Sequence, residues 1–185
     1  RRRDAEAVID VYSDTDIGPY NPMLTTYYVK GAIPYDALFP FGDLETIQQE
    51  LDLRVLTGRP VTGLVPEEKK ILFDGGEAVY DEILISTGAS TVMPPIPGLD
   101  LPGVFKMRTA QDAVELKRRL DGGEIRSGLV IGASWVGIKI VEDLVERDIP
   151  CTLVDGAEWM FCVAAFRETA LRAQKDLESK GVRVA

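Results

Sequence analysis

Residues 129–137 read Leu-Val-Ile-Gly-Ala-Ser-Trp-Val-Gly, an apolar run that ends in a tight glycine turn. A helical pattern over 138–146 follows the turn, and a second apolar run over 151–155 ends in Asp155. A strand, a glycine turn, a helix and a second strand that ends in an acid form the unit that holds a dinucleotide. The stretch therefore predicts a parallel α/β sheet with a nucleotide at its edge.

The residues of this turn are expected to have different roles in binding. Gly132 allows the tight turn, and Gly137 lets the helix pack closely on its strand. Backbone N–H groups at the start of the helix, around Ser134, Trp135 and Val136, would face the pyrophosphate, aided by the positive end of the helix dipole.

Asp155 forms the other half of this candidate site. It would accept hydrogen bonds from the adenosine ribose and repel a 2′-phosphate, which favours NAD(H) over NADP(H). Ser134 replaces the middle glycine of the fingerprint, so an ordinary strand–helix–strand crossover with a glycine for packing remains an alternative. The pattern GxSxxG also marks the nucleophile elbow of hydrolases. That elbow needs a histidine, and the chain contains none.

The composition excludes several classes of function. The net charge of −9 argues against a nucleic-acid or anionic membrane surface, and no apolar run approaches the ~20 residues that cross a membrane. The absence of histidine and of a cysteine cluster excludes zinc catalysis and histidine acid–base chemistry. Cys151 and Cys162 have no metal-ligand spacing, and a disulfide between them is not expected in a cytoplasmic protein.

Turn residues and periodicity predict strands that alternate with helices, so the fold class is α/β. Strands are expected over residues 7–12, 52–57, 61–65, 70–73, 78–80, 82–86, 104–108 and 182–184, and further helices over 23–29, 43–51, 109–120 and 164–180. Thr109 and Asp112 are similar to a capping box at the start of the helix over 109–120. Four of the eleven prolines fall in residues 91–102, which we interpret as an irregular linker between two nucleotide-binding units.

Two further motifs carry a resemblance to a known family. Tyr80–Ala89 with Pro94–Gly98 is similar to the signature YDxLxxATG…PPxPG, and Arg108–Ala113 is similar to RTxxDA. Together with Gly132–Gly137 and Asp155, these motifs resemble the FAD-dependent pyridine nucleotide-disulfide oxidoreductases, which are flavoproteins with two dinucleotide-binding domains. The resemblance implies Rossmann-like parallel sheets and two cofactors, FAD and NAD(H).

The amino-terminal part narrows the resemblance to a subgroup. Asp14, Tyr20-Asn21, Leu24 and Gly31 fall on the pattern E…YNRxLLSxxLxG of the flavin module of NAD(P)H-nitrite reductases, and rubredoxin reductases have similar segments. The family's first FAD glycine fingerprint and its carboxy-terminal segments have no counterpart here. We therefore expect an internal fragment, with a partial FAD-binding domain at 1–100 and a partial NAD(H)-binding Rossmann domain at 101–185.

The resemblance also implies which residues hold FAD. Asp14 would bind the adenosine ribose, Val61 would lie beside the adenine, and the backbone of Thr87-Gly88 would border the phosphates. Asn21 and Arg108, within the matched motifs, join the expected cofactor-binding residues. Two plainer alternatives remain, namely Asp14 as an acid that ends a strand and Thr87-Gly88 as a strand-ending turn.

Two departures from the family pattern bear on the chemistry. The redox cysteine pair has no counterpart, since Pro22-Met23-Leu24 stands in that region, and chemistry through an internal dithiol is not expected. Lys139 stands where the family has a glutamate that helps to position the nicotinamide. Either Glu142, one turn further, takes over part of that role, or nicotinamide binding is altered or lost.

The leading hypothesis is a FAD-dependent NAD(P)H oxidoreductase that passes hydride from NADH to the flavin and electrons on to a protein or small-molecule acceptor. Without a dithiol, an iron–sulfur or haem protein is the expected redox partner. The alternative is a non-catalytic dinucleotide-binding fragment or an electron-relay subunit of a larger complex. No catalytic residue is assigned, and the oligomeric state stays open.

Overall fold

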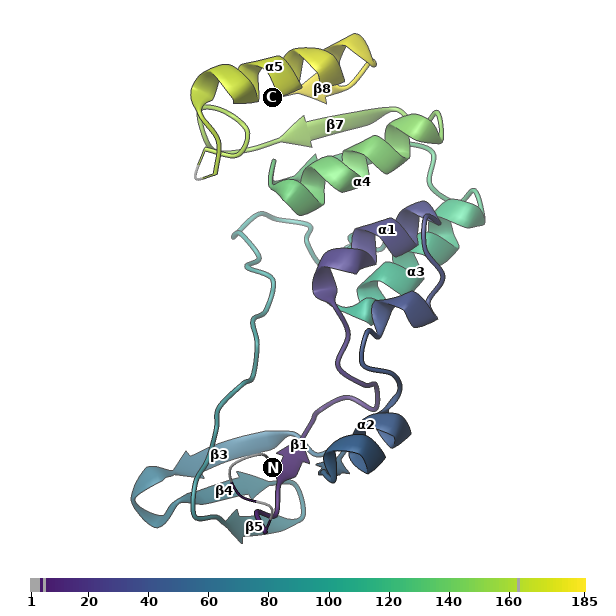
Figure 1. Cartoon of the computed structure of the whole chain (residues 1–185). Coiled ribbons are helices and arrows are strands. Elements are labelled where there is room, and N and C mark those ends of the chain that lie inside the picture. Colours follow the sequence, from purple (N-terminus) through teal and green to yellow (C-terminus); the bar gives the residue numbers. More distant parts are fainter. Residues whose placement is uncertain (1–3, 5, 163) are drawn as a thin grey trace. The chain divides into compact units, whose positions relative to one another are not determined.

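The computed structural model describes residue 4, residues 6–162 and residues 164–185 (Figure 1). The chain forms two compact units. The first contains the residues up to Asn21 together with Asp36–Ser90, and the second contains Pro22–Tyr35 together with Thr91–Ala185. The division at residue 100 into FAD-binding and NAD-binding domains concerns the cofactors and stays a prediction.

A short parallel pair of strands starts the first unit. β1 (Asp10–Tyr12) pairs with β2 (Arg54–Leu56), and α2 (Leu44–Leu51) connects them, preceded by η2 (Asp36–Leu38). Asp43, the predicted N-cap of α2, accepts a backbone N–H of the first turn at 2.8 Å. The pair is shorter than the strands predicted over 7–12 and 52–57.

A buried carboxylate ties β1 to β2. Asp10 lies opposite Arg54 in the parallel register, and its side chain is only 3% exposed. It accepts hydrogen bonds from Arg54 Nε at 2.9 Å and from the Tyr80 hydroxyl at 2.7 Å, and the Tyr80 and Tyr12 hydroxyl oxygens lie 2.9 Å apart. The hydrogen bond from Arg54 holds the pKa of Asp10 below its ordinary value, whereas burial raises the pKa of Tyr80.

An antiparallel sheet completes the first unit. Its strands, in order, are β3 (Val61–Val65), β4 (Lys70–Phe73) and β5 (Gly76–Val79), with η3 (Pro66–Glu68) between the first two. The predicted strands over 61–65 and 70–73 are confirmed. The ring of Phe73 packs against that of Tyr12 at a centroid distance of 5.0 Å, which joins this sheet to the parallel pair.

The second unit contains the strand–helix–strand arrangement that the sequence predicts. Its parallel sheet and connecting helices are β6 (Gly128–Ile131), α4 (Trp135–Glu146), β7 (Cys151–Val154), α5 (Arg167–Ser179) and β8 (Arg183–Val184), with the strand order β6-β7-β8. Val141 of α4 and Leu153 of β7 are fully buried in one core cluster. The α4 helix begins at Trp135 rather than at 138, because Ser134 serves as its N-cap.

β6 is the edge strand of this sheet among the described residues, with β7 on one side only. The side chains of β6 alternate in burial, and Val130 packs on the core. Leu129 and Ile131 are 63% and 50% exposed. One edge and one face of β6 are therefore open.

Two further helices belong to the second unit. α1 (Thr25–Lys30), which follows η1 (Pro22–Leu24), packs against both α3 (Ala110–Asp121) and α4 (Figure 1). The predicted capping box of α3 is confirmed, because the side chains of Thr109 and Asp112 each accept the other's backbone N–H.

Arg147 joins the three helices. It donates to Asp121 of α3 at 2.8 Å, to Asp143 of α4 at 3.0 Å and to the Val29 carbonyl of α1 at 3.2 Å. Asp143 is buried, so the arginine neutralises a charge inside the protein while it holds two neighbouring helices.

Two predicted strands are wrong. Residues 82–86 and 104–108 have apolar patterns but belong to no strand. A strand needs a hydrogen-bonded neighbour, and no ladder in the described chain includes either segment. Leu84, for example, is 91% exposed. The proline-rich linker between them has neither helix nor strand, as predicted.

No helix in the described parts of the chain is long and apolar enough to cross a membrane.

Replacement of Asp10 by Asn removes the charge that Arg54 neutralises, and we expect the free energy of unfolding at pH 7 to fall by about 1–3 kcal/mol. A carboxyl group with a lowered pKa in the folded state stabilises the protein above its unfolded pKa, and this contribution disappears as the pH falls through the folded pKa. The deficit of Asp10→Asn should therefore shrink below about pH 4.

Urea unfolding at a series of pH values measures this deficit. The exposed Asp16→Asn is the matched control and should unfold like the wild type. A deficit that stays constant between neutral and acid pH would contradict a charged, paired Asp10.

Candidate functional site

The glycine turn lies at the carboxyl end of β6. Gly132 has a φ of +103°, which favours glycine, and its N–H donates to the Val154 carbonyl at 2.8 Å. Gly137 lies so close to the Gly132 carbonyl that a Cβ atom on residue 137 would clash with the carbonyl oxygen. The first turn of α4 therefore rests directly on the end of β6.

The N-terminus of α4 offers backbone donors at this turn. Ser134 is the N-cap, and its Oγ accepts the Gly137 N–H at 3.5 Å. The first N–H groups of an α-helix have no acceptor within the helix, so the amides of Trp135 and Val136 can donate to an anion. With the positive end of the helix dipole, they form an arrangement that can bind phosphate.

Asp155 follows the last residue of β7 and lies beside the glycine turn. One carboxylate oxygen accepts the Ala133 N–H at 2.5 Å, and the other accepts the Ala157 N–H at 2.8 Å. An ionised carboxylate oxygen can accept more than one hydrogen bond, so the ribose hydroxyls can still donate to it. Asp155 thus has a second role, the anchoring of Ala133, that the sequence did not indicate.

Lys139 lies one turn into α4 and pairs with its neighbours. Its Nζ lies 2.7 Å from Glu142 and 5.6 Å from the centroid of the Tyr27 ring. Lys30 adds ion pairs to Glu142 at 3.6 Å and to Glu146 at 2.6 Å. The hydrogen bond from Lys139 holds the pKa of Glu142 below its ordinary value. Glu142 is thus engaged by two lysines, and the roles of both residues toward a nicotinamide stay predictions.

The residues predicted to hold FAD lie mostly in the first unit. Asp14 is exposed just after β1, and Val61 is exposed at the start of β3. Thr87-Gly88 is exposed too, and Gly88 has a φ of +72°. The backbone N–H of Asn21 donates to the Leu38 carbonyl at 2.8 Å. Their contacts with a cofactor stay predictions.

The residues predicted to bind NAD are brought together at one end of the parallel sheet of the second unit. They are Gly132, Ser134, Trp135, Val136, Gly137 and Asp155, with Lys139 on the next turn of α4. Arg108 also lies in the second unit, where its backbone N–H donates to Asp112 at 3.0 Å beside the cap of α3.

Sequence reasoning missed one residue that contacts the glycine turn, Phe161. Its ring lies against that of Trp135 with centroids 4.4 Å apart, and its N–H donates to the Ala133 carbonyl at 3.2 Å. The sequence offered only the apolar run over residues 159–163. An apolar run predicts burial but does not indicate which residues it contacts.

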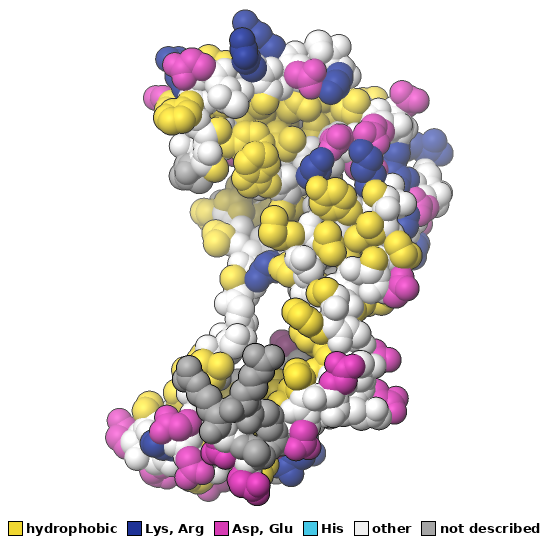
Figure 2. Space-filling view, in the orientation of Figure 1, with side chains coloured by type: hydrophobic (Ala, Val, Ile, Leu, Met, Phe, Trp, Pro, Cys, Tyr) yellow, Lys and Arg dark blue, Asp and Glu magenta, His cyan; other side chains and the backbone are white. Residues whose placement is uncertain are grey.

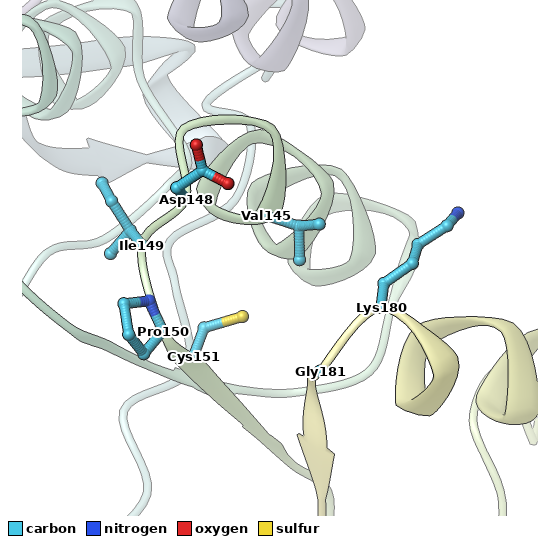
Figure 3. A pocket seen from close by; sticks show the side chains of 7 residues that line it. All are labelled: Val145, Asp148, Ile149, Pro150, Cys151, Lys180 and Gly181. Carbon is cyan, nitrogen blue, oxygen red and sulfur yellow. The ribbon is translucent and has the colours of Figure 1, made fainter.

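A hollow of about 250 Å³ lies elsewhere in the second unit (Figure 3). Its lining is Val145, Asp148, Ile149, Pro150, Cys151, Lys180 and Gly181. Cys151 starts β7, so the hollow lies at the end of that strand opposite Asp155. Burial raises the pKa of the Cys151 thiol and keeps it protonated. This hollow is therefore separate from the glycine turn.

Residues 2–185 match the family model of the pyridine nucleotide-disulphide oxidoreductases. The chain belongs to this family. An NADH-dependent phenylglyoxylate dehydrogenase subunit epsilon from Aromatoleum evansii is 30% identical over 85% of the chain and 37% of that protein. An NADH oxidase from Methanocaldococcus jannaschii is 29% identical over 98% of the chain and 41% of that protein.

Other members support the predicted subgroup and fold. The large subunit of a nitrite reductase [NAD(P)H] from Klebsiella oxytoca is 25% identical over 95% of the chain and 18% of that protein. The structure of a NAD-dependent persulfide reductase from A. fulgidus superposes on this chain with a TM-score of 0.91 and 27% sequence identity. The match covers all of this chain and 36% of the reductase chain. The family and the Rossmann-like α/β fold predicted from the motifs are confirmed. The chain spans less than half the length of each of these proteins.

Substitution of Gly137 by Ala places a methyl group against the Gly132 carbonyl, so the first turn of α4 must move. We expect the free energy of unfolding to fall by about 1–3 kcal/mol and dinucleotide binding to be lost. Gly156→Ala is the matched control, because a Cβ there meets nothing within 4 Å. Urea unfolding and NADH titration compare the two, and an unchanged unfolding midpoint for Gly137→Ala would contradict the close contact.

Proposed function

We propose that this chain is the coenzyme-binding part of a FAD-dependent NADH oxidoreductase. One observation carries the proposal. The turn at Gly132, the amides at the start of α4 and the carboxylate of Asp155 lie together at the carboxyl edge of a parallel sheet. This edge is where open α/β sheets receive a dinucleotide.

The residues at this edge would share the binding of NADH. The amides of Trp135 and Val136 would donate to the pyrophosphate, and Asp155 would accept from the adenosine ribose. Lys139 would lie on the nicotinamide side, as the family pattern indicates. When bound, NADH and FAD supply the hydride chemistry, and the chain orients them.

The first unit would hold part of FAD. Asp14 would accept from its ribose, Val61 would contact the adenine, and Thr87-Gly88 would border the phosphates, with Asn21 nearby in the matched motif. Asp14, Val61, Thr87 and Gly88 are exposed, which leaves them accessible to a ligand.

The charges around Asp155 favour NADH over NADPH. Residues 155–162 include two acids, Asp155 and Glu158, and neither lysine nor arginine. A 2′-phosphate at this position would meet negative charge without a basic partner.

For the electron acceptor, we propose a protein that carries an iron–sulfur or haem group. The two cysteines, Cys151 and Cys162, are both free thiols, one buried and one exposed. Two relatives are named as subunits of larger enzymes, which supports a protein partner.

The distribution of charge indicates where such a partner would bind. The first unit carries 16 acidic and 7 basic residues, whereas the second carries 14 of each, and acidic side chains stand out on the first unit in Figure 2. A partner with a basic surface complements the first unit. The cytoplasmic location stays a prediction.

A second candidate is an electron-relay subunit, or a dinucleotide-binding part that has no turnover of its own. The name of the phenylglyoxylate dehydrogenase subunit epsilon and the lysine at position 139 favour it. Only the first candidate requires that this protein itself bind FAD, so the flavin content separates the two.

Loss of the Asp155 carboxylate tests the ribose assignment. We expect Asp155→Ala to weaken NADH binding by about 1–2 kcal/mol, the contribution of a hydrogen bond to a charged group. Glu158→Ala, which removes the neighbouring acid, is the control and should leave NADH affinity unchanged. Titration with NADH measures both, and equal affinity in the wild type and Asp155→Ala would remove the assignment.

The absorption spectrum of the purified full-length protein tests the proposed activity. We expect flavin bands that bleach on anaerobic addition of NADH and bleach more slowly with NADPH. A protein without flavin would favour the second candidate. Flavin bands that do not respond to NADH would contradict the proposed reaction.

A further inference from the structure

We propose that Phe161 is a positioning residue for NADH binding, which fixes the glycine turn from the connection between β7 and α5. The inference rests on the proposed function, because it assumes that the glycine turn binds NADH. Phe161 itself is not expected to touch the reacting atoms.

The backbone of Phe161 is held in an uncommon conformation. Its φ of +56° lies in the left-handed region, where bulky residues are outliers. Its N–H donates to the Ala133 carbonyl at 3.2 Å, and its own carbonyl accepts the N–H groups of Ala164 at 2.7 Å and Ala165 at 2.8 Å. Such conformations persist only where the surroundings determine them, and they concentrate at functional sites.

The ring of Phe161 is placed by the core and meets the helix start. Met160, the preceding residue, is buried in the core cluster. The Phe161 ring lies against that of Trp135 with an interplanar angle of 33°. Figure 2 shows hydrophobic side chains gathered between the positions that α5 and α4 have in Figure 1.

Ala133 is consequently held from both sides. Its N–H is bound by Asp155 and its carbonyl by Phe161, and the residue is buried. Neither group can rotate without breaking a contact with the β7–α5 connection. The amides of Trp135 and Val136, which follow, are thus oriented before a ligand arrives.

Preorganised donors raise affinity because less ordering is required on binding. Loss of the Trp135–Phe161 contact should therefore weaken the binding of ligands that contain the pyrophosphate. Asp155 would still anchor the Ala133 N–H, so the effect should be partial rather than complete.

The test is titration of the full-length protein with NADH and with ADP, which share the pyrophosphate. Phe161→Leu removes the aromatic contact, and we expect it to lower the affinity for both NADH and ADP about 3- to 10-fold. Phe161→Tyr keeps the aromatic contact and should bind both ligands as tightly as the wild type does. Phe166→Leu is the matched control, because Phe166 belongs to the same connection but is 85% exposed.

Urea unfolding of each variant separates positioning from folding. A merely structural role would lower the unfolding midpoint of Phe161→Leu and leave the affinity of the folded protein unchanged, which would overturn the inference. An equal loss of affinity in Phe166→Leu would also overturn it, since the effect would then not belong to the contact with Trp135. Failure of the wild type to bind NADH would instead overturn the proposed function.

Discussion

The contact between Gly137 and the carbonyl of Gly132 is the constraint on which the second unit depends. The contact leaves no room for a side chain at position 137. Glycine therefore lets α4 approach the end of β6 more closely than any other residue at this position would allow. This approach brings the positive end of α4 to the sheet edge where Gly132 is bonded to Val154 and where Asp155 reaches Ala133. α1 packs on α4, and α3 packs on α1 in turn.

Each unit also contains a buried carboxylate that an arginine neutralises, across two strands in the first unit and at the end of α4 in the second. Asp10 pairs with Arg54 across two strands, and Asp143 pairs with Arg147, which also reaches the neighbouring helices. A buried charge that loses its partner destabilises a protein strongly. The Asp10–Arg54 pair therefore selects one register for β1 and β2, because a shifted register would leave a charge buried and alone. Arg147, held by Asp143, contributes to the packing of α1 and α3 through its hydrogen bonds to Val29 and Asp121.

Sequence reasoning succeeded where the physical cause is local. The turn at Gly132, the capping box at Thr109 and the strands over 61–65 and 70–73 each follow from a few adjacent residues, and the structure contains them. It failed over 82–86, since apolar residues form a strand only when a neighbour supplies hydrogen bonds. The contacts of Phe161 with Ala133 and Trp135 could not be predicted, because these residues are distant from Phe161 in the chain.

The open edge of β6 has a consequence for the behaviour of the protein in solution. A strand with unpaired backbone groups is a template for another strand, and natural proteins protect such edges with charges, prolines or covering segments. β6 has none of these within its four residues, and two of them, Leu129 and Ile131, are exposed apolar side chains. A segment that paired with β6 or covered this edge would therefore lower the tendency of the protein to aggregate.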